Sequence, residues 1–573
     1  MQSIRAATRN QRVFSTGMKN VDYIIIGAGS AGCTLAARLT EDAGANLLLL
    51  EAGGWDRNPW IKLPFAWGKV LRDRIYSWNY ETEPEPALDD RRVECARGKV
   101  IGGSSSINAM AYVRGHRADY DRWASYGLSG WSYADVLPYF RRQEKWEGGA
   151  DAYRGGEGPL TVETSRYQDP LVDAYLEAGH DAGHPATADY NGAEQHGFAR
   201  IQMTIRNGHR CSASVGYLRP TLGRDNLQVE TGALVTRILF EGTRAVGVEY
   251  LQNGERKTAR AEREVILAGG AVNSPQALML SGIGDPEELR ARGIETKVPL
   301  RGVGKNLQDH PAALITYART EPGPLRQNMR LDRLALSVTQ GLAFGTGFTT
   351  SLPGGIAAFL KSDAGEALPD VQLLFIAGPL FDAKPYLAPF RKPFNDGFGC
   401  RIVVLRPQAR GTISLKSADP AQAPRIAQNL LGIDHDKRKI RAAMKLFREI
   451  GTRKALQPFV KAEIVPGIAK QSDAELDAAI RATAVTVHHP AGSCRMGADE
   501  MAVVDGELRV HGTQGLRVID ASVFPDLVGG NINAAVIMIA EKSADMIRGK
   551  AAPPRANVSL RLKAFPSPSD TAL

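Results

Sequence analysis

A strand, a glycine-rich turn and a helix are predicted for residues 21–39, and this stretch constrains the fold most strongly. The run at 23–26, a tyrosine followed by three β-branched isoleucines, is typical of a buried parallel strand. It leads into G-A-G-S-A-G, in which Gly27 permits the tight turn, Gly29 lets a pyrophosphate approach, and Gly32 lets the helix lie close to the sheet. The positive end of that helix favours a phosphate ligand. The stretch therefore predicts a dinucleotide-binding βαβ unit.

A second predicted strand, at 46–50, ends at Glu51, which lies 19 residues after Gly32. An acid at that distance can accept hydrogen bonds from both ribose hydroxyls of an adenosine. No basic residue stands beside Glu51 to bind a ribose 2′-phosphate. We therefore expect FAD or NAD rather than NADP.

Composition predicts a large folded body and excludes several classes of protein. Apolar residues make up 43% of the 573, which is enough for a sizeable core. Residues 1–20 and 548–573 carry +4 each of the net charge of +9, which leaves +1 for the body, so we expect no nucleic-acid partner. The five cysteines show no C-x-x-C pair, which favours a reducing compartment over a disulfide framework. No apolar run approaches the ~18 residues of a transmembrane helix.

The two ends of the chain are predicted to be tails. Residues 1–19 are rich in Arg and free of acids, as a mitochondrial transit peptide would be, but we favour a disordered extension or a true start at Met18. Residues 550–573 are typical of a flexible tail. We expect a cytoplasmic protein, bound peripherally at the inner membrane if a quinone accepts its electrons, and mitochondrial only if 1–19 is a genuine transit peptide.

Three further stretches carry candidate chemistry. The loop at 96–110, ARGKVIGGSSSINAM, offers many backbone N–H donors and little bulk, which suits a second contact with an extended cofactor. The segment at 269–284, GGAVNSPQALMLSGIG, follows a predicted strand. His488 and His489 stand in V-H-H-P-A-G-S-C, and residues 515–547 read GLRVIDASVFPDLVGGNINAAVIMIAEKSADMI.

Together these motifs resemble the glucose-methanol-choline (GMC) FAD-dependent oxidoreductases, and within them the choline-dehydrogenase-like branch. The matching stretches are 98–108, 270–284, N-L-Q-D-H at 306–310 and H-P-x-G-x-C-R-M-G from His489, in the family's order. The resemblance implies an α/β (α+β) fold, with a Rossmann-like FAD-binding domain and a substrate-binding domain built on a large antiparallel sheet backed by helices. The implied FAD-binding domain comprises 20–160, 216–312 and 486–549, and the implied substrate-binding domain comprises 161–215 and 313–485.

The family implies FAD as the cofactor. In some relatives a histidine at the position of Ile107 links covalently to the flavin, so FAD is expected to be non-covalent here. By the resemblance, the residues around FAD are Gly27, Gly29, Ser30, Ala31, Gly32, Glu51, Ala52, Arg97, Val100, Gly102, Gly103, Ser106, Asn108, Ala109, Val235, Asp520, Ala521 and Asn531.

The family also places one histidine over the flavin and a second His or Asn 40-odd residues later, which assigns His489 and Asn533, 44 residues apart. Alcohol oxidation removes a proton from oxygen and a hydride from carbon. A neutral imidazole can take the proton, and an amide can bond the alkoxide without titrating.

For His488 the pattern leaves two assignments open. Residues before proline favour extended backbone, in which neighbours face opposite sides. We therefore expect His488 to turn away from the flavin as a paired structural residue, with a role in the pocket as the alternative. A metal site is disfavoured because His488, His489 and Cys494 lack ligand spacing. The absence of G-x-S-x-G disfavours a hydrolase.

The predicted substrate is a neutral primary alcohol, oxidised to the aldehyde. Choline-specific relatives hold the trimethylammonium with a glutamate, whose equivalent falls near Gly355, and no acid occurs within 349–360. Electrons would pass to a quinone, another carrier or O₂, and we favour a dehydrogenase. The alternatives are an oxygen-using oxidase, a fatty-acid photodecarboxylase or lyase, and a non-catalytic flavin-binding protein. His489 argues against the photodecarboxylase, whose relatives lack it.

In the implied substrate-binding domain, strands are predicted at 370–377, 400–406 and 411–416. The run QSDAELDAAIRATA predicts a helix with Ser472 as N-cap and Glu475 at the capping-box position.

Overall fold

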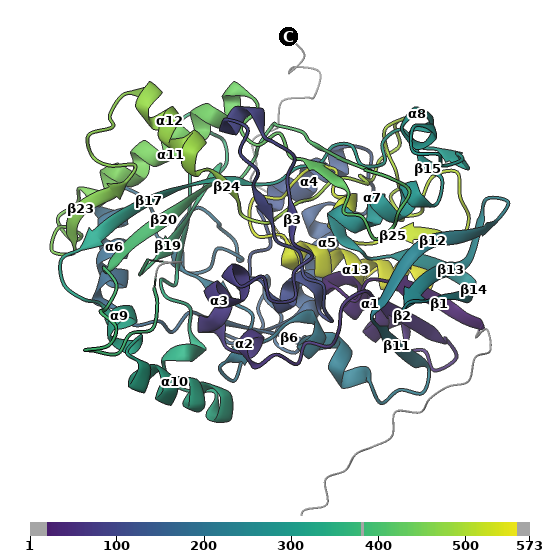
Figure 1. The fold of residues 1–573 in the computed structure, drawn as a ribbon, viewed down its shortest axis with the longest axis horizontal. Helices are drawn as coiled ribbons and strands as arrows, with labels where there is room; N and C mark the ends of the chain where they lie inside the picture. Colours follow the sequence, from purple (N-terminus) through teal and green to yellow (C-terminus); the bar gives the residue numbers. More distant parts are fainter. Residues whose placement is uncertain (1–19, 380–382, 559–573) are drawn as a thin grey trace, which may run out of the picture.

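Strands from both ends of the chain build the sheet on the right of Figure 1. The computed structural model describes residues 20–379 and 383–558. In this sheet β2, β1, β14 and β25 are parallel, β11 runs parallel to β2, and β13 and β12 continue it antiparallel. The bounds are β1 (Asn20–Ile26), β2 (Leu47–Glu51), β11 (Leu227–Thr231), β12 (Ala233–Glu241), β13 (Arg244–Gln252), β14 (Glu255–Leu267) and β25 (Leu516–Val518).

The central strands of this first sheet are buried because they are apolar along their whole length. β2 reads LLLLE and is buried at every position, as expected for a parallel strand covered on both faces. Helices α1 (Ser30–Leu39) and α13 (Asn533–Ile547) pack against each other. Glu541 on α13 is fully buried, and Arg38 and Arg142 pair with it. Apolar packing and the ion pair between Arg38 and the buried Glu541 thus join α1 to α13.

A second sheet, on the left of Figure 1, is antiparallel in the order β23-β17-β20-β19-β18-β7, with β24 on β17. On β20 the even-numbered residues Phe398, Cys400 and Ile402 pack on the helices of the outer face, whereas Val403 packs on the inner face. The outer helices are α6, α11 and α12. The bounds are β7 (Gly197–Arg200), β17 (Pro311–Arg319), β18 (Ile356–Leu360), β19 (Val371–Ile376), β20 (Gly397–Val404), β23 (Val460–Val465), β24 (Val485–Thr486), α6 (Pro170–Asp181), α11 (Asp434–Gly451) and α12 (Asp473–Thr483).

Shorter elements connect and border the two sheets. The helices are α2 (Pro59–Lys62), α3 (Trp67–Arg72), α4 (Arg117–Ser125), α5 (Tyr133–Gln143), α7 (Gly270–Leu280), α8 (Pro286–Arg290), α9 (Pro324–Asn328) and α10 (Leu331–Phe344). The strands are β3 (Tyr80–Glu81), β4 (Glu94–Cys95), β5 (Glu144–Trp146), β6 (Leu160–Thr164), β8 (Gln202–Met203), β9 (Ile205–Arg206), β10 (His209–Arg210), β15 (Ile283–Gly284), β16 (Val298–Pro299), β21 (Thr412–Ser414) and β22 (Arg425–Ala427).

Most of the expected elements are confirmed. The strand–turn–helix is β1 and α1, and the strands predicted at 370–377 and 400–406 are β19 and β20. Ser472 caps α12, and the capping box with Glu475 is present. The strand predicted at 411–416 forms instead as β21, which pairs with β22 in a separate ribbon. The domain boundaries stay a prediction, supported by the division of strands between two sheets.

The two expected tails fall partly or wholly outside the described residues. The whole of 1–19 and the residues from 559 onward lie outside them. Residues 550–558 are described and contact α5, since Ala556 N donates to Ala134 O at 2.9 Å and Arg555 pairs with Asp135. This part of the predicted flexible tail is therefore held against the body.

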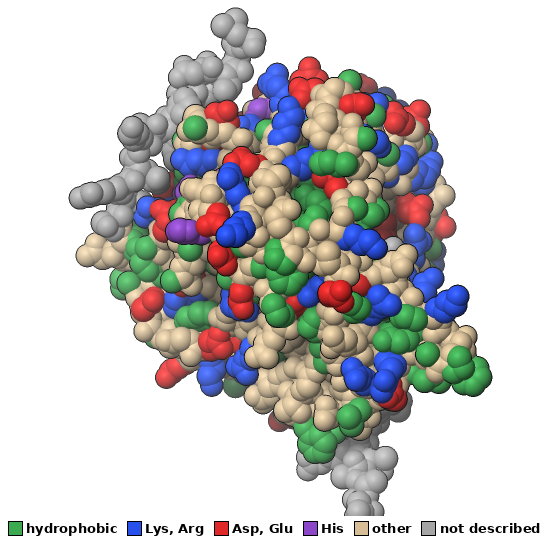
Figure 2. Space-filling view, turned by 90° about the vertical axis from the view of Figure 1, so that its left-hand side faces the viewer, with side chains coloured by type: hydrophobic (Ala, Val, Ile, Leu, Met, Phe, Trp, Pro, Cys, Tyr) green, Lys and Arg blue, Asp and Glu red, His purple; other side chains and the backbone are tan. Residues whose placement is uncertain are grey.

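Three structural features relate to the classes considered from composition: the cysteines, the apolar character of the helices, and the distribution of surface charge. All five cysteines lie within the described residues, where each is a buried free thiol. Within the described ranges, no helix combines the length and apolar character needed to cross a membrane. On the face shown in Figure 2, basic and acidic side chains are interspersed, so that face carries no continuous basic patch.

Candidate active site

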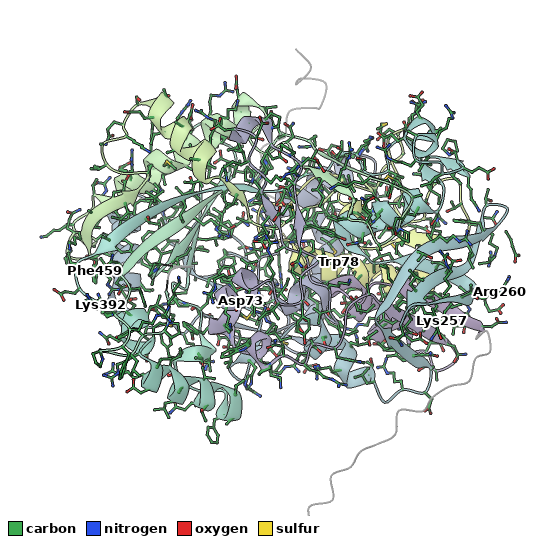
Figure 3. All side chains as sticks on the ribbon, in the orientation of Figure 1. Asp73, Trp78, Lys257, Arg260, Lys392 and Phe459 are labelled. Carbon is green, nitrogen blue, oxygen red and sulfur yellow. The ribbon has the colours of Figure 1, made fainter. Side chains whose placement is uncertain are left out.

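One cavity of about 470 Å³ lies between the two sheets. The glycine turn after β1, the loop at 96–110 and the end of β14 border it on one side, and β18, β19 and β20 border it on the other. Trp78, labelled near the centre of Figure 3, is among the lining residues. Its size and partly apolar lining suit a cofactor and a small substrate.

At one end of the cavity the glycine turn has the geometry expected of a pyrophosphate site. Gly27 has φ +99°, and a Cβ there would lie 2.6 Å from the Ala268 carbonyl oxygen. A Cβ on Gly32 would lie 1.9 Å from the Gly27 carbonyl oxygen, so α1 begins in direct contact with the turn. Only glycine fits at these two positions. By contrast a Cβ on Gly29 would meet nothing closer than 4.0 Å, which leaves its backbone open to a ligand.

Glu51 lies at the same end, and its carboxylate is oriented by the backbone. The oxygens accept from Ala28 N at 2.9 Å and from Gly53 N at 2.8 Å. Burial raises the pKa of Glu51 to about 7, although these N–H groups oppose the shift. A carboxylate accepts about four hydrogen bonds, so each oxygen keeps capacity for a ribose hydroxyl. The orientation and the remaining acceptor capacity of the Glu51 carboxylate therefore suit the ribose of an adenosine.

The serine- and glycine-rich loop contacts the glycine turn directly. Gly102 N donates to the Ala28 carbonyl oxygen at 2.7 Å. Gly103 has φ +52°, and a Cβ there would lie 2.6 Å from Gly29 Cα. The two loops therefore converge on one strip of the cavity, which fits the pyrophosphate of an extended dinucleotide.

The structure divides the residues expected around FAD into two groups. Those that line the cavity are Gly27, Gly29, Ser30, Ala31, Glu51, Ala52, Arg97, Gly103, Asn108, Ala109, Val235, Asp520, Ala521 and Asn531. Those that stand behind its wall are Gly32, Val100, Gly102 and Ser106. Ser106, for example, is buried and donates to the Ile101 carbonyl oxygen at 2.8 Å.

His489 lies at the centre of a hydrogen-bonded group at the other end of the cavity. Its backbone N–H donates to Asp309 Oδ1 at 2.9 Å. Its Nδ1 lies 3.0 Å from His310 Nδ1, and its Nε2 lies 3.1 Å from Asn531 Nδ2. Gln372 on β19 donates to Asn531 Oδ1 at 3.3 Å, which turns the amide nitrogen toward His489. The segment before β17 and the loop before α13 thus hold this histidine from two sides.

Asn533 does not contact His489. Its Oδ1 accepts from Ser30 Oγ at 2.6 Å, so it joins the start of α13 to the start of α1 while still lining the cavity. Asn531, expected only as a cofactor contact, occupies the position beside the imidazole. The structure therefore brings His489 together with Asn531, two residues before the predicted partner.

The hydrogen bonds determine which nitrogen of His489 carries its proton. His310 Nε2 lies 3.1 Å from the Leu405 carbonyl oxygen, which only accepts, so His310 is protonated on Nε2. A neutral His310 must then accept on Nδ1, and His489 must donate to it from its own Nδ1. The Nε2 of His489 is left unprotonated, with its lone pair beside Asn531. That atom is a base.

Electrostatics keep both imidazoles neutral. Burial lowers the pKa of His310 to about 4. Burial also holds the pKa of His489 well below its usual value, with further lowering by His310 and the Arg97 guanidinium. Both rings are neutral at pH 7, as the tautomer assignment requires.

His488 departs from the sequence expectation. Its φ is +65°, so the backbone turns sharply instead of staying extended, and both histidines border the cavity. No described residue bonds to its Nδ1, although the atom is buried. Burial, with Arg97 and Arg401, lowers the pKa of His488 to about 3. The expected pairing of a structural residue is wrong for this nitrogen, and the alternative, a residue of the pocket, agrees with its position.

Two residues of the group escaped the sequence analysis. His310 and Asp309 were noted only as part of N-L-Q-D-H. Asp309 accepts from the backbone N–H groups of His310 and His489, and from Thr486 Oγ1 at 2.5 Å. Burial raises its pKa to about 6. An acid followed by a histidine at the start of a strand was the available signal, but its proximity to His489 arises only in the fold.

Comparisons with known proteins agree with this geometry. Residues 21–312 and 407–540 match the N-terminal and C-terminal family models of GMC oxidoreductases. The chain is 44% identical to mitochondrial choline dehydrogenase of Mus musculus, over 94% of this chain and 91% of that protein. It is 46% identical to the oxygen-dependent choline dehydrogenase of Pseudomonas syringae pv. tomato, over 94% and 95%. Pyridoxine 4-oxidase from Mesorbium loti superimposes with a TM-score of 0.83 at 31% identity, over 93% of this chain and 100% of that one.

The chain belongs to the GMC oxidoreductases. It is an FAD-dependent enzyme that oxidises CH–OH groups, with the two-sheet α/β fold of that family.

Proposed function

We propose that the enzyme oxidises a primary alcohol to the aldehyde, with His489 Nε2 as the base that takes the hydroxyl proton. The observation that carries the proposal is the hydrogen-bond chain from Leu405 through His310, which leaves that nitrogen unprotonated and facing the cavity. FAD, when bound, supplies the acceptor for the hydride from the alcohol carbon. Proton and hydride together account for the two hydrogens that the alcohol loses.

Asn531 supports the same step. Its amide nitrogen lies 3.1 Å from the base, and its oxygen is held by Gln372. The amide can donate to the substrate oxygen as negative charge develops there, and it does not titrate. We propose Asn531 for the role that the sequence pattern assigned to Asn533. Asn533, bonded to Ser30, is proposed to position the start of α13 against the cofactor.

We propose transfer to an external acceptor, a quinone, another carrier or O₂, with non-covalent FAD because position 107 is Ile. The relatives named as mitochondrial and as oxygen-dependent choline dehydrogenases support the dehydrogenase class. Location in the cytoplasm, free or peripheral at the inner membrane, stays a prediction.

The test is anaerobic reduction of the bound flavin. The purified holoenzyme is mixed without oxygen with choline, benzyl alcohol, hexanol, pyridoxine and a sugar alcohol, and loss of the visible flavin absorbance is followed. At least one alcohol is expected to bleach the flavin. His489→Ala is expected to keep its FAD and to slow bleaching by about 100-fold or more, as loss of a general base implies.

The matched control is His511→Ala. His511 also bonds a backbone carbonyl, that of Gly497 at 3.1 Å, but is not among the residues that line the cavity. It should bleach at the parent rate. A His489→Ala enzyme that kept FAD and the parent rate would exclude His489 as the base.

A further inference from the structure

Arg401 brings a positive charge to the substrate side of the cavity. It lies on β20 and lines the cavity together with Leu374, its partner in register on β19. The neighbouring residues Cys400 and Ile402 face the opposite side, where the outer helices pack. Alternation along the strand therefore directs the Arg401 side chain inward.

Loss of hydration is the only influence on the pKa of the Arg401 guanidinium, and none of the described residues forms an ion pair or a hydrogen bond with it. The neighbouring Arg97, by comparison, donates to the carbonyl oxygens of Ala96 and His488. Arg401 is only half-buried because it borders the cavity, yet loss of hydration lowers its pKa to about 10. It stays charged at pH 7, and buried or half-buried charges are normally paired.

The described lining of the cavity supplies no counter-charge on that side. Its two acids are Glu51 and Asp520. Glu51 lies at the glycine turn and bonds to Ala28 and Gly53. Asp520 accepts from Gly270 N at 2.8 Å and from Ser274 Oγ at 2.5 Å. Neither acid contacts Arg401, so a cationic substrate would meet only uncompensated positive charge here.

His488 adds a polar atom to the same region. Its Nδ1 has no described partner, and both Arg401 and Arg97 act electrostatically on its ring. The unpaired guanidinium and the unpaired imidazole nitrogen lie close enough to His489 to affect it as well. Buried polar groups normally have hydrogen-bond partners. Two polar groups without a described partner, both near the proposed base, therefore indicate a binding site for a polar ligand.

We propose that the substrate is an alcohol bearing a carboxylate, and that Arg401 binds this carboxylate while the hydroxyl faces His489. The inference rests on the proposed alcohol oxidation and adds the substrate class. Arg and carboxylate form short, often bidentate, charge-assisted hydrogen bonds. Ile356 of β18 and Phe375 of β19 add apolar surface to the same cavity, which suits the carbon skeleton of such an alcohol.

The experiment compares alcohols that differ in charge but little in shape. The holoenzyme is reduced anaerobically by para-(hydroxymethyl)benzoate, by the corresponding amide, and by choline. The variants are Arg401→Met and Arg401→Lys, and the control is Arg256→Met, whose arginine pairs with Glu249 on the hairpin of β13 and β14. Flavin content is measured for each variant.

The parent enzyme is expected to have a higher kcat/KM for para-(hydroxymethyl)benzoate than for the corresponding amide. Arg401→Met should lower kcat/KM for the carboxylate by about 10- to 100-fold, as loss of a charge-assisted hydrogen bond implies, and should leave the amide within about 3-fold. Arg401→Lys should recover part of the loss because it keeps the charge, and Arg256→Met should match the parent. Equal rates for carboxylate and amide, a preference for choline, or loss of FAD from Arg401→Met would each overturn the inference.

A second readout separates this inference from the proposed function. Para-methylbenzoate lacks the hydroxyl and cannot be oxidised, but its binding can be followed by the shift of the flavin spectrum. Binding that weakens about 10-fold or more in Arg401→Met supports the carboxylate site even if no alcohol reduces the flavin, an outcome that would refute only the oxidation. If the amide reduces the flavin and para-methylbenzoate binds equally to parent and variant, the oxidation stands and the carboxylate site is refuted.

Discussion

His310 offers the sharpest test of the proposed base, because it acts only through His489. Its side chain contacts the Leu405 carbonyl and His489 Nδ1. His310→Leu removes the acceptor for the His489 Nδ1–H and leaves that N–H buried without a partner. The unpaired N–H costs the base-competent tautomer about 1–3 kcal/mol. Since each 1.36 kcal/mol is tenfold, flavin reduction should slow by about 5- to 150-fold.

The assay is the anaerobic reduction rate at saturating alcohol, with FAD content and thermal stability measured in parallel. His310→Gln should recover much of the rate, because an amide can accept on its oxygen and donate from its nitrogen, as the neutral imidazole does. A purely structural role would affect stability in both variants without this difference in rate. His511→Leu serves as the control. A His310→Leu enzyme that binds FAD and reduces it at the parent rate would refute the tautomer argument.

Three further outcomes follow from the site. Asn531→Ala should slow flavin reduction by about 10-fold or more by removing a donor to the developing alkoxide, whereas Asn533→Ala should chiefly weaken FAD retention; equal rate losses would contradict the assignment. Gly103→Ala should lose FAD, measured by flavin absorbance per protein, because its Cβ would push the two glycine loops apart, whereas Gly127→Ala, with φ +82° and nothing within 4 Å, should not. Because the pKa of His489 is held well below its usual value, the neutral base persists as pH falls, so the reduction rate should stay level from pH 8 to pH 6; an inflection near pH 6.5 would show an unperturbed imidazole.

The fold and the cofactor end of the site were predictable because they depend on local patterns. The strand–turn–helix from β1 to α1 needs glycines at fixed spacing, and the capping box of α12 needs Ser472 and Glu475 three residues apart. Both motifs depend on residues that are close together in the sequence, so a single sequence is enough to predict them.

The catalytic end was only partly predictable because its contacts join distant segments. Spacing along the chain could not show which of Asn531 and Asn533 lies beside His489. The choice depends on where α13 begins, and the helix starts at Asn533, so Asn531 precedes it and projects in another direction. The extended backbone expected at His488 was wrong because a positive φ is rare in residues other than glycine and has no mark in V-H-H-P. His310 reaches His489 only after β17 and β24 pair.

The contact between Ser30 and Asn533 spans 503 positions of the chain, so two residues that line one cavity are made near the beginning and near the end of synthesis. A ribosome adding roughly 5–20 residues per second needs about 25–100 s to travel from one residue to the other. For most of that interval the chain lacks the imidazole of His489 and β25, and α13 is made last of the three. A ligand that binds only the finished site cannot stabilise the earlier nascent chain. A polypeptide that stops short of α13 would keep the glycine turn but would lack Asn533, which lines the same cavity and bonds to Ser30.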